Sequence, residues 1–309
     1  MKLLSKYIFY GILFLIVGVV SFWASYFFNY FLEITDGLAY SRAYEKISSL
    51  DLIDGYENFI IYTGGAEPLS FLIFYSFSKF TSIEIFNGIL NTFLLLLTFK
   101  FLYNQRIKIL ISFPLVITNY YLLVLEFGVL RLKIALIFWM LSLITENKKK
   151  SNLFYLFSFI SHFQMALILL IKLLVDIVVK GNFKIKFNYV IIFLVVSTLL
   201  FERVLGKFLL YYSSELHFPF KTVLFFLPMF FVVNRLKFLS ITFIIFFILG
   251  VIIGEERLVI LLFFLLMSEY LLFAKRDITR GFILVIYCSY FSIKGIFFAK
   301  SLIDGVSYF

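Results

Sequence analysis

Carboxylates, a histidine and arginines stand at the edges of the apolar segments of this chain. A carboxylate or an imidazole can take a proton from a hydroxyl group, and a guanidinium binds phosphate oxygens in bidentate fashion without losing its charge. Gathered near one surface, such side chains can support acid–base chemistry on an anionic substrate. The candidates are Asp36, Glu67, Arg131, His162, Glu255 and Arg257.

Each candidate also has an ordinary structural explanation. Asp36 fits a loop acid near the membrane interface, and Glu67 before a proline fits a helix start, where acids and proline are favoured. Arg131 fits an interfacial anchor whose charge snorkels to water. His162 fits a histidine hydrogen-bonded between helices, and the turn around Arg257 fits a local ion pair.

The elements that must position these residues are apolar helices in a membrane. Of 309 residues, 63% are hydrophobic and 15% are charged, whereas soluble domains carry roughly 25% charged residues. The apolar residues form long blocks and do not alternate with polar ones, which predicts membrane-spanning helices and not barrel strands. The net charge of +10 then reflects cytoplasmic loops rich in Lys and Arg, and we expect no nucleic-acid partner.

Several classes of site lack their motifs here. The sequence has no GxxxxGK[ST] or GxGxxG nucleotide cradle, no GxSxG nucleophile elbow and no HExxH zinc motif. A single cysteine, Cys288, excludes an intrachain disulfide and a Cys-rich metal site. We therefore expect no cofactor and no metal site.

We predict an all-α, polytopic transmembrane helical bundle in one integral membrane domain, residues 1–309. The first apolar stretch is long and aromatic for a signal peptide and lacks a small-residue cleavage site, so we interpret it as a retained helix. Roughly eleven spans are expected. They lie near 7–28, 83–103, 109–126, 129–145, 151–161, 163–179, 187–203, 220–234, 237–254, 257–274 and 281–299.

Two placements follow from the positive-inside rule, which puts Lys and Arg in cytoplasmic loops. Residues 67–80 are short for a span, and counting them as one would place lysines 148–150 outside, so we expect an interfacial or re-entrant helix. Residues 153–179 have lysines at both ends, so we divide this block at 161–164 into a hairpin with an outward tip. Both choices bring the candidates to the outer side, where 29–81 forms a long extracytoplasmic loop.

The long outer loop is expected to contain helices of its own. Its first part has an amphipathic pattern, which predicts a helix lying on the membrane surface. The apolar residues of this pattern are Tyr40, Tyr44, Ile47 and Leu50. We expect residues 67–80 to dip into the membrane beside it.

Four short segments, taken in chain order, resemble motifs of the EpsG/Wzy-type family of polysaccharide repeat-unit polymerases. The aromatic spacing after Asp36 is shifted, Asn and Gln are missing around Arg131, and Met165 replaces a serine of the family, which leaves the substrate open. A weaker similarity lies near residue 257. The similar segments are Thr35-Asp36-Gly37 with Tyr40 and Tyr44 for G-T-D-Y-x-x-Y, Ala66-Glu67-Pro68-Leu69 for E-P-x-F/L, Gly128 to Ala135 for N-G-I-R-Q-A-I-A, and Ser161 to Leu167 for F-H-x-S-A-L.

The resemblance implies a glycosyltransferase of the bacterial cytoplasmic (inner) membrane, with a layout similar to GT-C enzymes. Such a polymerase joins undecaprenyl-pyrophosphate-linked oligosaccharide repeat units at the outer face of that membrane. Asp36 would be the first choice for the base, with Glu67 and His162 close behind, and Arg131 and Arg257 would hold the pyrophosphate. Its partners would be undecaprenyl-pyrophosphate-linked glycans, membrane lipid and a chain-length regulator. The remaining substrate-binding residues would be Tyr40, Gln164 and Glu255.

Two rival functions stay open. A transferase that adds one sugar from a lipid-phosphate donor would use nearly the same residues but give a single addition in place of a ladder. A non-enzymatic lipid-glycan flippase or transporter predicts charges along a path at mid-membrane depth and pseudo-repeated halves, and the sequence displays neither.

Overall fold

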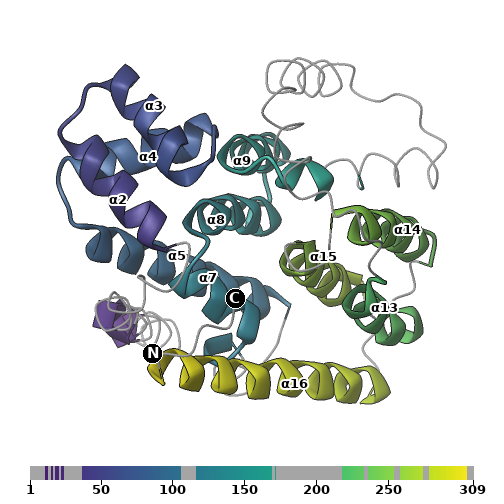
Figure 1. The fold of residues 1–309 in the computed structure, drawn as a ribbon. Coiled ribbons are helices and arrows are strands. Elements are labelled where there is room, and N and C mark those ends of the chain that lie inside the picture. Colours follow the sequence, from purple (N-terminus) through teal and green to yellow (C-terminus); the bar gives the residue numbers. More distant parts are fainter. Residues whose placement is uncertain are drawn as a thin grey trace. The chain divides into compact units, whose positions relative to one another are not determined.

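The computed structural model describes residues 37–105, 116–168, 218–232, 236–253, 258–273 and 278–304, together with residue 171 and a few residues between 11 and 23. In this part of the chain every regular element is an α-helix (Figure 1). The chain divides into two compact units. One consists of Met1–Phe163 with Tyr287–Phe309, and the other is Gln164–Ile286.

Three short helices follow the first apolar segment. Helix α2, Gly37–Ser48, buries Gly37, Tyr40, Ala43, Tyr44 and Ile47, which recur at three- and four-residue spacing and share one face. A helix is thus present where one was expected, although it ends before Leu50, and α2 packs against α3 and α4. Its placement on the membrane surface stays a prediction.

Helices α3 and α4 have well-defined ends. Asp51 begins α3, Leu52–Thr63, because its carboxylate accepts hydrogen bonds from the backbone of Ile53 and Asp54. Gly64 ends α3 in the left-handed conformation with φ of 59°, which glycine adopts without steric cost. Helix α4, Pro68–Ser78, is about 16 Å long at 1.5 Å per residue, too short to cross a hydrocarbon layer of about 30 Å.

Four further helices complete most of the described part of this unit: α5 (Ile83–Asn104), α7 (Tyr120–Phe127), α8 (Leu130–Ile144) and α9 (Lys148–Ser161). Helix α8 packs against α5, α7 and α9 and lies between α7 and α9 in Figure 1. Side chains of Asn119 and Asn147 cap α7 and α9. Because α7 begins at this cap, the helix expected over 109–126 is interrupted before Tyr120.

An aromatic cluster joins the short helices to α5. Phe59, Phe74 and Phe86 are each fully buried. The ring of Phe74 lies 5.4 Å from that of Phe59 and 5.2 Å from that of Phe86, in edge-to-face geometry. Tyr44 stacks on Phe86 at 5.4 Å, and its hydroxyl lies 3.0 Å from Thr81 Oγ1. Edge-to-face pairs add stabilisation beyond buried area, so α2, α3, α4 and α5 form one packed group.

The second unit contains three apolar helices, α13 (Phe220–Val232), α14 (Leu236–Ile253) and α15 (Leu258–Phe273). Helix α13 packs against both others, while α14 leaves Ile244 and Ile248 about half exposed. The last helix, α16 (Ile278–Ile303), begins in this unit and ends in the first. There Phe291 and Phe298 contact Tyr121 and Tyr120 of α7.

The described helices fit a membrane bundle in composition. Among the helices that the structure describes, only α5 is long and apolar enough to cross a bilayer by itself, and α7 with α8 would add a second span if that bent pair, at 118°, crosses as one. The helices α8, α9, α13, α14, α15 and α16 fall on expected spans. The number of crossings stays a prediction, and most of 7–28 and 163–179 and all of 187–203 lie outside the described residues.

Phe74→Ala should destabilise the first unit by about 3–5 kcal/mol, because it opens a cavity where three aromatic rings meet. Phe80→Ala is the matched control, since the Phe80 side chain is 87% exposed. Thermal unfolding of the detergent-purified full chain, followed by circular dichroism, compares the two variants. Equal midpoints would contradict the role given to the cluster.

Candidate functional site

The carboxylate of Glu67 lies between Arg131 and His162. Its Oε2 atom accepts a hydrogen bond from Arg131 Nη1 at 2.5 Å, and its Oε1 atom lies 3.2 Å from Nδ1 of His162. The three residues are only 3%, 8% and 9% exposed. Residues from the start of α4, the start of α8 and the end of α9 thus form one buried cluster, which we call the Glu67 cluster.

Glu67 does not act as an ordinary helix cap. It occupies the N-cap position of α4, yet its side chain makes no hydrogen bond to the backbone of that helix. Both carboxylate oxygens are used by residues more than 60 positions away in sequence. The helix-start explanation therefore accounts for the position of Glu67 but not for the direction of its side chain.

Arg131 is held by three different groups. Besides Glu67, its Nε donates to the hydroxyl of Tyr40 at 3.2 Å, and its Nη2 donates to the backbone carbonyl of Thr63 at 3.1 Å. A snorkelling arginine keeps its charge in water, whereas this guanidinium is buried, so the snorkelling explanation is wrong here. A guanidinium has five N–H groups; three are used by these partners, and two make no hydrogen bond within the described residues.

The turn between α3 and α4 requires glycine. A Cβ atom on Gly65 would lie 1.4 Å from Arg131 Nη1 and 2.4 Å from Glu67 Oε2, distances at which atoms overlap. Gly64, which ends α3, places the Thr63 carbonyl where Arg131 can reach it. The Gly64-Gly65 pair therefore lets the backbone approach the ion pair directly.

His162 is fixed by the end of α9. It follows Ser161 as the C-cap residue in an extended conformation, and the Ser161 carbonyl accepts a hydrogen bond from Ser70 Oγ of α4 at 2.7 Å. The predicted break in the block 153–179 is confirmed at this point, because α9 ends at Ser161 and helical structure resumes at Met165. The direction of the following segment lies outside the described residues.

The other expected site residues are placed less fully. Tyr40 belongs to the cluster through its bond to Arg131. Gln164 lies two residues beyond His162, where its backbone carbonyl accepts from Leu167 at 3.1 Å, and its role stays a prediction. Asp36, Glu255 and Arg257 lie outside the described residues.

A second buried polar group, not foreseen from the sequence, lies next to the first. Lys133 is fully buried, and its Nζ donates to Asn87 Oδ1, to Asn91 Oδ1 at 2.5 Å and to the backbone carbonyl of Glu126 at 3.0 Å. Both asparagine amides donate to that same carbonyl at 3.2 Å. The available signal was the spacing of Asn87 and Asn91, which puts two amides on one face of an apolar helix.

Lys133 secures the bend that precedes Arg131. Glu126 lies in the last turn of α7, where backbone carbonyls lack partners within the helix, and Lys133 lies in the first turns of α8. Residues two positions apart on a helix point in nearly opposite directions. Arg131 thus faces α2, α3 and α4, while Lys133 ties the same helix to α5 and α7.

Comparison with known proteins identifies the family. The model of the EpsG family matches residues 7–219, more than half of the chain, so the chain belongs to the EpsG family. The match includes the whole Glu67 cluster and Lys133. No curated protein and no solved structure matches the chain.

Gly65→Ala should break the contact between Arg131 and Glu67, because the added methyl group occupies the position of Arg131 Nη1. We expect a loss of stability of about 3–5 kcal/mol, the scale for breaking a buried ion pair. Gly18→Ala is the control, since a Cβ there meets nothing within 4 Å. Thermal unfolding of the detergent-purified full chain is the readout, and a wild-type midpoint for Gly65→Ala would contradict this geometry.

Lys133→Met should lower the thermal stability of the protein. It leaves the amide oxygens of Asn87 and Asn91 buried without their donor, at about 1–3 kcal/mol for each unsatisfied group. Adding Asn87→Leu and Asn91→Leu should recover only the share of stability lost through the two amide oxygens, because the Glu126 carbonyl then lacks all three of these donors. Thermal unfolding of the single and triple variants tests this, with the exposed Lys149→Met as control. If Lys133→Met unfolded at the same temperature as wild type, Lys133 would not stabilise the bend between α7 and α8.

Proposed function

We propose that this EpsG-family protein polymerises undecaprenyl-pyrophosphate-linked oligosaccharide repeat units at the outer face of the cytoplasmic membrane. The observation that carries the proposal is that Glu67 contacts both a phosphate-binding side chain, Arg131, and a proton acceptor, His162. Family membership over residues 7–219 and the apolar helices support the same reading.

His162 is the base in this proposal, and Glu67 positions it. When Nδ1 of the neutral imidazole donates to Glu67, the other ring nitrogen, Nε2, is the one that accepts a proton. The carboxylate then stabilises the imidazolium that forms, as in other base–carboxylate pairs. Asp36, the first choice from the resemblance, remains the alternative base, because it directly precedes α2, the helix that carries Tyr40.

Arg131 binds the leaving group. Its guanidinium stays charged under all conditions of interest, and Glu67, Tyr40 and Thr63 fix its orientation. The guanidinium has two further N–H groups besides the three that make these contacts, and they can donate hydrogen bonds to two oxygens of a pyrophosphate. The fixed orientation means that charge developing on the leaving group meets a donor that needs no rearrangement.

The reaction is a single displacement at the anomeric carbon of the donor glycan. The hydroxyl of the acceptor repeat unit gives its proton to His162 while its oxygen attacks that carbon. The bond between the carbon and the pyrophosphate oxygen breaks, and undecaprenyl pyrophosphate leaves with the bonding electron pair beside Arg131. Further partners of this proposal are the surrounding membrane lipid and a chain-length regulator.

Arg131→Lys and Glu67→Gln should each lower polymerisation by about 10²–10³-fold. Lysine cannot reproduce the bidentate fork, and glutamine removes the negative charge shared by Arg131 and His162. His162→Ala should do the same, whereas Asp36→Asn should retain activity if His162 is the base. The glycan ladder of a deletion strain complemented with each variant is the measurement.

The controls are Glu146→Gln, at an exposed position before α9, and Arg280→Lys, in the first turn of α16. Membrane fractions should contain equal amounts of every variant. Normal ladders from both Arg131→Lys and Glu67→Gln would overturn the proposal. Extension by one sugar would point to the single-sugar transferase, and unprocessed units retained on the inner face would point to the flippase.

A further inference from the structure

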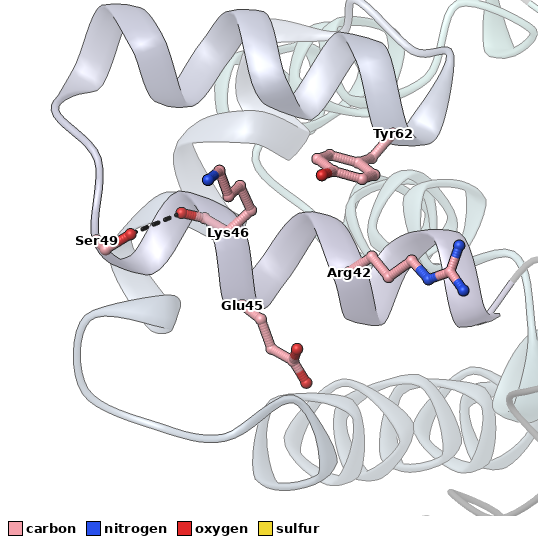
Figure 2. Close-up of a pocket in the computed structure, with 5 residues that line it drawn as sticks. All are labelled: Arg42, Glu45, Lys46, Ser49 and Tyr62. Atoms are coloured by element: carbon pink, nitrogen blue, oxygen red, sulfur yellow. Dashed lines mark hydrogen bonds between the residues drawn. The ribbon is translucent and has the colours of Figure 1, made fainter.

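A polar hollow lies along α2 and α3, outside the Glu67 cluster. It has a volume of about 350 Å³ and is lined by Arg42, Glu45, Lys46, Ser49 and Tyr62. Figure 2 shows Lys46 and Tyr62 in the space between the two helices, with Arg42 toward one end of α2 and Ser49 beyond the other. Arg42, Glu45 and Lys46 of α2 lie on the side opposite its buried face, and Ser49 follows the helix.

The hollow and the Glu67 cluster share the end of α3. Tyr62 lines the hollow and immediately precedes Thr63, whose carbonyl holds Arg131. On α2 the two sites use different faces, because Arg42 points away from the buried face that carries Tyr40. The opposite end of the hollow, at Ser49, is at the far end of α2.

The lining suits sugar rings. Arg42 and Lys46 are donors, Glu45 is an acceptor, and the hydroxyl of Ser49, which donates to the Lys46 carbonyl at 3.2 Å, retains lone pairs for a further donor. The ring of Tyr62 is 38% exposed and offers an apolar face with a polar rim. Hydroxyl-rich rings with apolar C–H faces match this mixture, and two cations against one anion favour sugars that carry a carboxylate.

We infer that the α2–α3 hollow is a glycan subsite, which binds sugar residues of the lipid-linked repeat unit beyond the one that reacts. The inference rests on the proposed polymerase function for the identity of the ligand. Two glycans meet at the reaction centre, the donor chain and the acceptor unit, and both have the chemistry that the hollow recognises.

Binding of the delipidated repeat-unit oligosaccharide to the purified full chain in detergent tests the subsite without catalysis. The probe is released by mild acid from lipid-linked units of a polymerase-deficient strain, and calorimetry measures its Kd. Tyr62→Ala should weaken binding about three- to tenfold, the scale for losing one aromatic contact, and Lys46→Gln should weaken it similarly for an acidic glycan. Tyr103→Ala and Lys300→Gln are matched controls at exposed positions.

Polymerisation kinetics assign the bound glycan. If the subsite holds the acceptor, Tyr62→Ala raises the KM for added oligosaccharide acceptor at a fixed concentration of lipid-linked donor. If it holds the donor chain, the variant raises the KM for the lipid-linked donor. In both cases kcat stays within about twofold, because Tyr62 does not contact the reacting atoms.

The subsite and the polymerase function fail in different ways. Wild-type protein that does not bind the oligosaccharide, or Tyr62→Ala and Lys46→Gln variants that bind it like wild type, would overturn the subsite even if Arg131→Lys abolishes the ladder. Oligosaccharide binding that depends on Tyr62, in a protein that forms no polymer, would sustain the subsite and remove the polymerase function.

Discussion

The buried carboxylate of Glu67 constrains the whole first unit. A charge out of contact with water is tolerated only with a partner and hydrogen bonds, and removing one member of a buried ion pair typically costs about 3–5 kcal/mol. Glu67 and Arg131 are therefore stable only together. This requirement brings the start of α4 to the start of α8, and the contact with His162 adds the end of α9.

Helix α8 is the element through which this constraint spreads. One cation near its N-terminus, Arg131, faces the short helices, and another, Lys133, faces α5 and α7. The bend of 118° between α7 and α8 leaves carbonyls in the last turn of α7 in need of donors, and Lys133 satisfies one of them. The two buried cations fix the position and the rotation of α8 from opposite sides.

Much of the local structure could be predicted from residue patterns. The face of α2, the start of α4 at Pro68, the short length of residues 67–80 and the break after Ser161 follow from helical periodicity, proline and polar runs. The grouping of Glu67, Arg131 and His162 was expected from charge placement and family resemblance. The signal was the spacing of apolar residues in α2, and elsewhere a polar residue or proline within apolar surroundings.

The remaining contacts depend on atoms that every residue possesses. The carbonyls of Thr63, Ser161 and Glu126 hold Arg131, Ser70 and Lys133, and no residue type identifies them in advance. The direction of the Glu67 side chain could not be predicted either. An acid before a proline gives the same sequence pattern whether its side chain caps the helix or points away from it. The sequence around Lys133 indicates only a segment similar to the family and does not predict the three partners of this lysine.

Arg131 is held in part by a backbone carbonyl, and this affects which neighbouring residues can change during evolution. The contact depends on the turn that Gly64 and Gly65 create, where the Thr63 hydroxyl also accepts a hydrogen bond from the Gly65 amide at 3.2 Å. The exposed residues of α2 and α3 take no part in it, so they can change while the guanidinium keeps its orientation. A few fixed residues, two of them glycines, leave the neighbouring surface free to evolve.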